Sequence, residues 1–259
     1  MPGSILAETT RTGKLLQFTE EDHRYVIKDK ESGNEEKELI SVTTLIGNYH
    51  PKFDADGSIA RNVALKRGVT VESVKAEWAS AGPYGTRVHE YMEDLIRGNK
   101  PRNEPQDERE RIVFEQVAHF FKNTLKPNFE TMTPEKIICD YDLGIAGTID
   151  FLGKDPRADQ LIMMDWKTNT RMDVTPFGGK EQWCYPPVDH IPDCNYGHYQ
   201  LQLNLYEYIL KHAGYISPTI PVVKYLVHFH KDTGTTMYKV PDRKKEVEAI
   251  IEDYLSKKQ

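Results

Sequence analysis

The chain has 259 residues, a formal net charge of −6 at pH 7, and 38% hydrophobic and 29% charged residues. This length allows a large domain with its own hydrophobic core, and no apolar run approaches membrane-spanning length, which argues against a transmembrane protein. The mild negative charge disfavours a general nucleic-acid coat protein, but it is compatible with an enzyme whose carboxylates are neutralised by bound cations.

The first half of the chain predicts a hairpin followed by helices. Residues 23–46 carry two strand patterns around a Gly-Asn turn. Residues 57–80 favour short helices, and the AGPYG stretch at 81–85 is expected to interrupt them. Apolar residues recur at helical spacing in 86–98, where a glycine is a natural stop, and again in 106–125.

The second half alternates between strands and helices. Three short strands, separated by turns that contain Gly, Asp or Pro, are predicted at 136–144, 145–153 and 160–168. After an irregular stretch at 171–197, the predicted elements are a helix at 198–214, a hairpin at 222–241 and a helix at 243–258. This order predicts an α/β fold around one mixed sheet.

A charged pair ends the third of these strands. In LIMMDWKTNTR, residues 161–171, Asp165 and Lys167 are two apart and share a face, whereas Trp166 faces the other way. Asp150 ends the preceding strand, and the short connection allows the two strands to be antiparallel neighbours. Asp150 and Asp165 would then lie side by side and repel each other unless a divalent cation joins them. The simpler alternative is a surface salt bridge at a strand end.

Two helices offer further polar side chains. His89 borders the apolar face of the helix predicted at 86–98, where a packing histidine is the simpler interpretation. Gln202 and Tyr206 are four apart and therefore share one helix face. The Gln202 amide can donate to a phosphate or hold a water, and the Tyr206 hydroxyl can donate a hydrogen bond. The simpler interpretation of this pair is a core-facing amphipathic helix.

Taken in chain order, these residues resemble a known enzyme superfamily. The residues that carry the resemblance are His89, Asp150 in GTID, Asp165 and Lys167 in DWKTN, and the pair Gln202 and Tyr206. The pattern resembles the PD-(D/E)XK nuclease superfamily, above all its RecB-like exonuclease branch of phage and mitochondrial genome-maintenance exonucleases, over roughly residues 41–230. SVTTLI ahead of GTRVHEYMED, and PPVDHIPDCNYGHYQLQLNLY later in the chain, are also similar to members of that branch.

The resemblance implies a fold and its organisation. It implies a restriction-endonuclease-like core with a central mixed β-sheet flanked by helices, at residues 129–259. Residues 1–128 would form an N-terminal hairpin and helical region that carries the motif histidine, and the two parts would make one compact unit.

The resemblance also implies roles for individual residues. The implied metal ligands are His89, Asp150, Asp165 and the backbone carbonyl of Trp166, for one or two Mg²⁺ or Mn²⁺ ions. The implied catalytic residues are Lys167, Asp150, Asp165, Gln202 and Tyr206, the last two supporting the lysine and contacting the DNA backbone. Many relatives carry a further acid ahead of the GTID strand, and here Glu130, Glu135, Asp140 and Asp142 all stay open.

The three cysteines limit what else the chain can hold. Cys139, Cys184 and Cys194 are too few and too scattered for a disulfide framework, a Cys-x-x-Cys knuckle or the four-cysteine iron–sulfur cluster of some relatives. This usage suits a reducing compartment, and the N-terminus lacks the features of a signal peptide. We therefore expect a soluble protein of the cytoplasm of a bacterial or phage-infected cell, or of an organelle if the source is eukaryotic.

The sequence thus predicts a metal-dependent DNA nuclease, specifically an exonuclease acting on DNA ends in replication, recombination or repair. Its expected partners are single- or double-stranded DNA ends and phage or host recombination proteins, with no membrane. Arg61, Lys66 and Arg67 are expected to bind DNA along one wall of a channel, although an ordinary solvated face would look the same. The alternatives are a catalytically silent DNA-binding module of the same fold, a structure-specific endonuclease, and a hydrolase of small phosphoesters.

Overall fold

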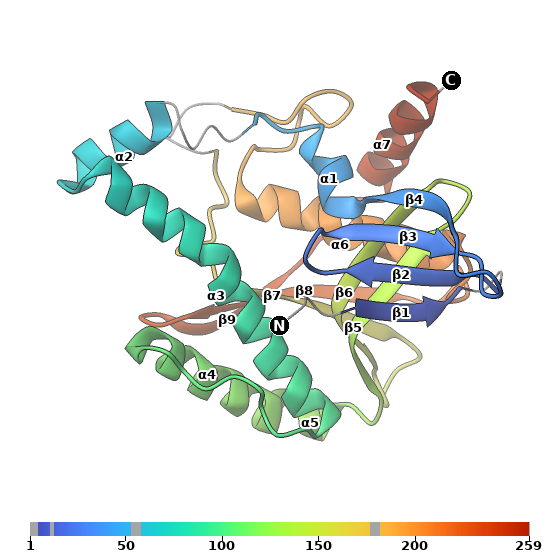
Figure 1. The fold of residues 1–259 in the computed structure, drawn as a ribbon, viewed down its shortest axis with the longest axis horizontal. Coiled ribbons are helices and arrows are strands. Elements are labelled where there is room, and N and C mark those ends of the chain that lie inside the picture. The colour runs from blue at the N-terminus through green and yellow to red at the C-terminus, as the bar shows by residue number, and fades with distance from the viewer. Residues whose placement is uncertain (1–4, 11–12, 53–57, 177–181, 259) are drawn as a thin grey trace.

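A computed structural model of the protein describes residues 5–10, 13–52, 58–176 and 182–258. Among these residues, nine strands form one mixed sheet with helices on both faces (Figure 1). The predicted α/β class, with a central mixed sheet flanked by helices and an N-terminal helical region, is confirmed, and the arrangement is consistent with a restriction-endonuclease-like core. No helix in the described ranges combines the length and apolarity that crossing a membrane requires.

Four N-terminal strands form an antiparallel meander. They are β1 (Ile5–Thr9), β2 (Leu15–Thr19), β3 (Arg24–Lys28) and β4 (Glu35–Ser41). The predicted hairpin corresponds to β3 and β4, while β1 and β2 were not predicted. The end of β4 then pairs in parallel with β6 (Ile145–Lys154), so the meander continues into the central sheet.

The N-terminal helices are α1 (Val42–Gly47), α2 (Ser58–Arg67) and α3 (Val71–Arg97). The interruption predicted at residues 81–85 is wrong, because α3 runs through Pro83 without a break. A proline inside a helix costs roughly 3 kcal/mol, and the buried face of α3 offsets this cost. Tyr84, Val88 and Met92 on that face pack into the same core cluster as α4 (Glu108–Phe120).

The helix predicted at 106–125 is α4 followed by a π-helical turn at Phe121–Leu125 and the short α5 (Lys126–Asn128). The C-terminal strands are β5 (Met132–Asp140), β7 (Leu161–Lys167), β8 (Val222–His230) and β9 (Gly234–Lys239). The remaining helices are α6 (Asn195–His212) and α7 (Lys244–Ser256). The predicted helix at 198–214 is therefore confirmed, and it begins three residues earlier because the Cys194 side chain caps it.

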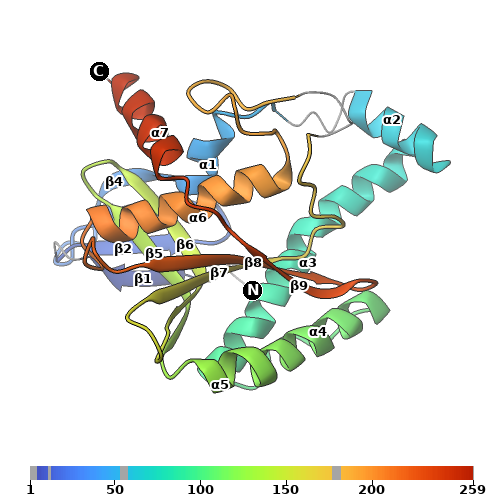
Figure 2. The same cartoon turned by 180° about the vertical axis from the view of Figure 1, so that it is seen from behind.

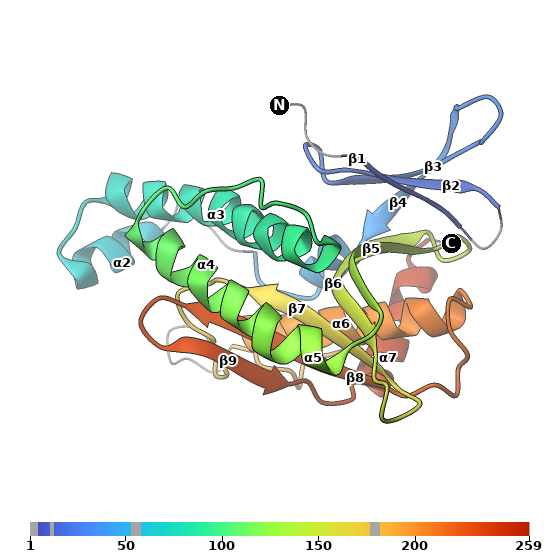
Figure 3. The ribbon, with the colours of Figure 1, turned by 90° about the horizontal axis from the view of Figure 1, so that it is seen from below.

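The helices form two layers on opposite faces of the central strands. Met163 and Leu226 contact the core that contains α1, α6 and α7, whereas their neighbours Met164 and Val227 contact the core of α3 and α4. This alternation follows from the two-residue period of a strand. Figure 2 shows α6 in front of the sheet with α7 next to it, and Figure 3 shows α3 and α4 side by side on the other face.

The sheet forks at β6. One edge of β6 pairs with β5 along most of its length. The other edge pairs with β4 at its start, Ile145 and Ala146, and with β7 at its end, Phe151–Lys154. In the described part of the chain, residues 147–150 therefore have no ladder partner on that edge. Places where strand neighbours change are common ligand sites in α/β sheets, and the polar residues predicted to be functional gather here.

Candidate active site

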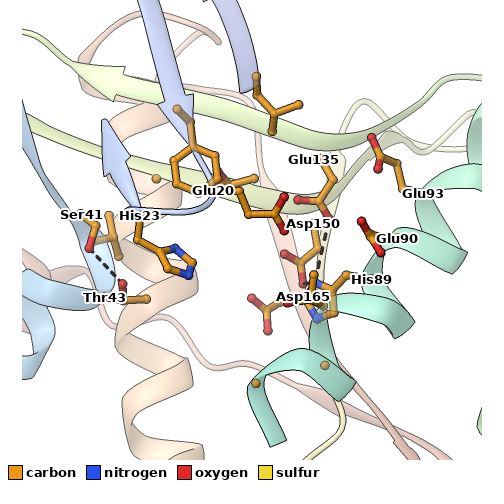
Figure 4. Close-up of a pocket in the computed structure, with 18 of the residues that line it drawn as sticks. Glu20, His23, Ser41, Thr43, His89, Glu90, Glu93, Glu135, Asp150 and Asp165 are labelled. Atoms are coloured by element: carbon orange, nitrogen blue, oxygen red, sulfur yellow. Dashed lines mark hydrogen bonds and ion pairs between the residues drawn. The ribbon is translucent and has the colours of Figure 1, made fainter. Parts of the chain in front are cut away.

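A pocket of about 370 Å³ lies at this fork. Its walls come from the turn between β2 and β3, the start of α1, the middle of α3, strands β5 to β7 and helix α6 (Figure 4). Segments that are far apart in the sequence thus meet around one cavity, and the carboxylates at its floor define its chemistry.

Three carboxylates lie in a row across three strands. In β5 and β6, Glu135 and Asp150 lie between the paired residues Pro134–Phe151 and Lys136–Ile149. The ladder of β6 with β7 ends at Phe151 and Met164, next to Asp150 and Asp165, and the Trp166 N–H donates to Asp150 Oδ2 at 2.7 Å. Asp150 is 7% exposed and Asp165 is 2% exposed. Figure 4 shows the three side chains converging on His89. The structure therefore brings together the two predicted aspartates and one of the four further acids that the sequence left open.

Burial and mutual repulsion make the ionised cluster unfavourable. Burial, followed by the charges of Asp150 and Glu93, raises the pKa of Glu135 well above its ordinary value. Burial raises the pKa of Asp165 to about 6, although the charge of Lys167 opposes this rise. A divalent cation among these oxygens would remove the repulsion and stabilise the ionised forms.

Glu135 is the further acid that reaches the site. Its backbone φ of 48° lies in the left-handed region, which is rare for residues other than glycine and concentrates at functional sites. Asp140 instead contacts His212 at 2.5 Å, and Asp142 and Glu130 are exposed. The sequence could not single out Glu135, because the strand that carries it begins at Met132, before the predicted start at 136.

His89 reaches the carboxylates from α3. Its Nδ1 lies 3.5 Å from Asp150 Oδ2 and 3.9 Å from Glu135 Oε1, and its Nε2 lies 3.0 Å from the Trp166 carbonyl oxygen. Ligand atoms of His89, Glu135 and Asp150 all lie within 4.8 Å of one another. His89 is thus part of the polar cluster rather than an ordinary packing histidine.

Lys167 and α6 surround the other side of Asp165. Lys167 Nζ lies 2.5 Å from Asp165 Oδ2 and 4.1 Å from the centre of the Tyr199 ring. Burial lowers the pKa of Lys167, but its interactions with Asp165, Tyr199 and Asp150 together outweigh burial, so the net pKa is raised. Gln202 Nε2 donates to Asp165 Oδ1 at 3.3 Å and to the Tyr206 hydroxyl at 2.9 Å. The predicted Gln–Tyr pair therefore holds the predicted aspartate in place.

The donors present fit a divalent cation. Asp165 Oδ2 is buried and, within the described residues, accepts no directed hydrogen bond, although Lys167 Nζ neutralises it as an ion partner. Carboxylate and carbonyl oxygens with one imidazole form the type of ligand set that Mg²⁺ and Mn²⁺ accept. His89, Glu135, Asp150, Asp165 and the Trp166 carbonyl would hold such an ion.

The Trp166 side chain points away from the pocket. It is 1% exposed and lies at ring-centre distances of 6.1, 5.9 and 6.2 Å from Phe120, Phe151 and Phe229. Because strand residues alternate, this burial is what turns Asp165 and Lys167 together toward the site. Only the backbone carbonyl of Trp166 faces His89.

The predicted DNA-binding residues lie elsewhere. Arg61, Lys66 and Arg67 are exposed on α2, and Arg67 is paired with Glu77 at 2.7 Å. Among the described residues, the lining of the pocket includes none from α2. The structure thus does not bring these three side chains to the carboxylates, and their contact with DNA stays a prediction.

Part of the pocket wall was missed by sequence reasoning. Glu20 and His23, in the turn between β2 and β3, line the pocket together with Ser41 and Thr43 at the start of α1 (Figure 4). Ser41 and Thr43 belong to the SVTTLI stretch, but no motif marks Glu20 or His23. The position of Glu20 and His23 depends on β2, which is only five residues long and carries too short a pattern to predict.

Comparisons with known proteins found similar solved structures only. No protein-family model and no curated protein matches the chain. A putative exonuclease from Eubacterium rectale is 14% identical with a TM-score of 0.42, covering 68% of this chain and 65% of that one. An alkaline exonuclease from Laribacter hongkongensis is 11% identical with a TM-score of 0.33, covering 85% of this chain and 87% of that one. This chain thus spans less than two thirds of the length of the first.

Replacing Glu135 should weaken metal binding more than replacing the other acids that the sequence left open. We expect Glu135→Gln to lower Mn²⁺ affinity about 10–100-fold, because it removes a charged ligand. Its stability without metal should be unchanged or higher, since a carboxylate next to Asp150 is also removed. Titration calorimetry with Mn²⁺ measures the first effect and thermal unfolding the second. Asp142→Asn and Glu130→Gln are the matched controls, and equal Mn²⁺ affinities in all three variants would contradict the placement of Glu135.

Gly147 in the GTID strand leaves room for the α6 tyrosine. A Cβ at this position would lie 2.4 Å from Cε1 of Tyr206, which is far inside van der Waals contact. We expect Gly147→Ala to lower the free energy of unfolding by about 1–3 kcal/mol and to displace Tyr206 and Gln202, lowering cleavage up to about 100-fold. Gly47→Ala is the control, since its Cβ meets no atom within 4 Å. Unchanged stability and activity in Gly147→Ala would show that α6 does not pack as described.

Proposed function

We propose that this protein is a metal-dependent DNA nuclease of the PD-(D/E)XK type. The single observation that supports this most is the row of Glu135, Asp150 and Asp165 across three adjacent strands, with His89 above it and Lys167 against Asp165. A surface salt bridge would explain only the last pair. It would give no reason for two buried carboxylates, a half-buried third and a histidine around one pocket.

The residues of the site divide into two groups by what they would do. His89, Glu135, Asp150, Asp165 and the Trp166 carbonyl would hold one or two Mg²⁺ or Mn²⁺ ions. When bound, the metal supplies an activated water and neutralises charge on the phosphate.

Lys167 would act on the substrate, and the Gln202–Tyr206 pair would position Asp165. The Lys167 ammonium is held between Asp165 and the Tyr199 ring, where it stabilises negative charge that develops on the phosphodiester. Gln202 is anchored by Tyr206 and keeps Asp165 in one orientation. A rigid set of this kind favours catalysis because no reorganisation is needed at the moment of reaction.

We further propose that the enzyme is an exonuclease that works on DNA ends in replication, recombination or repair. The resemblance of its motif order to the RecB-like branch supports this refinement. Arg61, Lys66 and Arg67 on α2 would contact the phosphate backbone of DNA outside the pocket. The protein partners of the enzyme would include phage or host recombination proteins. Such contacts are salt-dependent and sequence-independent, which suits an enzyme that acts on DNA ends of any sequence.

The test is cleavage of matched linear and covalently closed circular DNA with Mg²⁺ or Mn²⁺, and with EDTA as the metal-free control. We expect loss of the linear form with release of nucleotides and no effect on the closed circle. Cutting of closed circles would overturn the exonuclease refinement and leave an endonuclease. Cleavage of neither form with either metal would overturn the nuclease proposal, and binding without cutting would then identify a silent DNA-binding module.

A further inference from the structure

A second cluster of metal-ligand side chains lies outside the pocket described above. His50 follows α1, Cys184 and Asp193 belong to the segment at 182–194, and His198 is in the first turn of α6. Ligand atoms of His50, Asp193 and His198 all lie within 4.8 Å of one another. Cys184 Sγ lies 3.2 Å from His50 Nδ1 and joins the cluster as a fourth side chain.

The contacts within the cluster are close and shielded from water. His198 Nε2 lies 2.8 Å and His50 Nδ1 3.7 Å from the same atom, Asp193 Oδ1. The two imidazole rings are 3.4 Å apart between centres. His50 is 6% exposed, and Asp193 and Cys184 are each 3% exposed. Ligand atoms bound tetrahedrally at 2.0–2.3 Å would be separated by about 3.3–3.8 Å. The separation of His50 from Asp193 lies in this range, whereas the separations of Cys184 from His50 and of His198 from Asp193 are shorter, at 3.2 and 2.8 Å, and would widen around an ion.

His50 has two ring nitrogens, of which Nδ1 faces Cys184 and Asp193. His50 Nε2 is buried and, among the described residues, has no hydrogen-bond partner. A buried polar atom without a partner costs roughly 1–3 kcal/mol. A hydrogen bond between Asp193 and His198 alone would satisfy those two residues, but it gives no reason for a second buried imidazole and a thiol around the same carboxylate.

We propose that His50, Cys184, Asp193 and His198 bind one structural Zn²⁺ ion. Two imidazoles, one carboxylate and one thiolate form a mixed nitrogen, oxygen and sulfur set of the kind that zinc prefers. The active-site cluster is rich in oxygen and suits Mg²⁺ or Mn²⁺ instead. Binding converts the Cys184 thiol to a thiolate, and the proton is released to solvent.

The proposed zinc would add a link between three segments that already share one hydrophobic core cluster. The segment at 182–194 contains one isolated bridge, Trp183 to Pro192, within the described residues. His198 lies one turn before Gln202 on α6, the helix whose side chains hold Asp165. The ion would therefore fix the start of α6 relative to α1 and stabilise the helix from which Gln202 projects. Structural zinc sites contribute directly to folding free energy.

The test uses Zn²⁺ alone and a protein in which the active site cannot compete for it. The full chain with Asp150→Asn and Asp165→Asn is stripped with a chelator, and bound zinc and the Tm are measured as Zn²⁺ is added. We expect one Zn²⁺ per chain and a Tm rise of roughly 5–10 °C at a free Zn²⁺ concentration 100-fold above Kd. Because the measurement does not involve DNA cleavage, failure of the proposed nuclease function would not affect it.

Matched variants in the same background identify the ligands. His198→Gln and Cys184→Ser should each lower zinc affinity at least about 10-fold, whereas His119→Gln and Cys139→Ser should not. With Co²⁺ in place of Zn²⁺, we expect tetrahedral ligand-field bands and a thiolate charge-transfer band that Cys184→Ser removes. If His198→Gln fails to fold, the zinc stoichiometry and the Co²⁺ spectrum of the parent protein decide. Absence of bound zinc, or binding that neither ligand variant weakens, would overturn the proposal.

Discussion

Asp165→Asn and Lys167→Ala are each expected to lower metal-dependent DNA cleavage by roughly 10²–10³-fold or more. Asp165 is proposed to hold the metal, and Lys167 to carry the positive charge beside it, so each substitution removes an interaction that the transition state needs. The two side chains touch at 2.5 Å. Because they act as a unit, the double variant should be little worse than either single variant. Cleavage rates at saturating Mn²⁺ measure all three.

A second Lys–Asp pair serves as the control. It distinguishes an active-site role of Asp165 and Lys167 from the simple salt bridge that the strand end also suggests. Lys154, the last residue of β6, and Asp159, in the loop before β7, form an exposed pair at 3.8 Å. Lys154→Ala and Asp159→Asn should leave cleavage unchanged and shift stability by less than about 1 kcal/mol. If Asp165→Asn and Lys167→Ala behave in the same way as these two, the carboxylate row is not an active site.

The part of the site that depends on short-range periodicity could be predicted. Asp165 and Lys167 share a face because strand residues alternate, and a short connection brings Asp150 alongside. Gln202 and Tyr206 share a helix face for the analogous reason. These statements need only the local conformation, which the apolar pattern around each residue determines.

The part that depends on long-range packing could not be predicted. Glu135 reaches the row through a left-handed backbone conformation and a strand register that no local pattern encodes. The continuity of α3 through Pro83 depends on burial against α4, which outweighs the local preference. His50 and His198, which are far apart in the sequence, meet only because α1 packs against α6.

Trp166→Ala is expected to lower the free energy of unfolding by about 3–5 kcal/mol, a large part of the stability of an ordinary domain. The indole is 1% exposed between rings from α4, β6 and β8, so its removal leaves a cavity that those rings cannot fill. Trp166→Phe keeps most of the contact and should cost less. Trp183→Ala is the control, since that side chain is 43% exposed, and denaturant unfolding compares the three.

The same substitution tests how Trp166 serves the metal site. The side chain stabilises the sheet, whereas the proposed ligand is the backbone carbonyl, which every residue has. Trp166→Phe should therefore retain the Mn²⁺ affinity of the parent protein, and its cleavage rate should match once the fraction of folded protein is taken into account. A tenfold loss of Mn²⁺ affinity in fully folded Trp166→Phe would mean that the ring does more than pack. The indole and the backbone carbonyl of Trp166 would then not have separate roles, because β7 would need the packed indole to direct the carbonyl toward the ion.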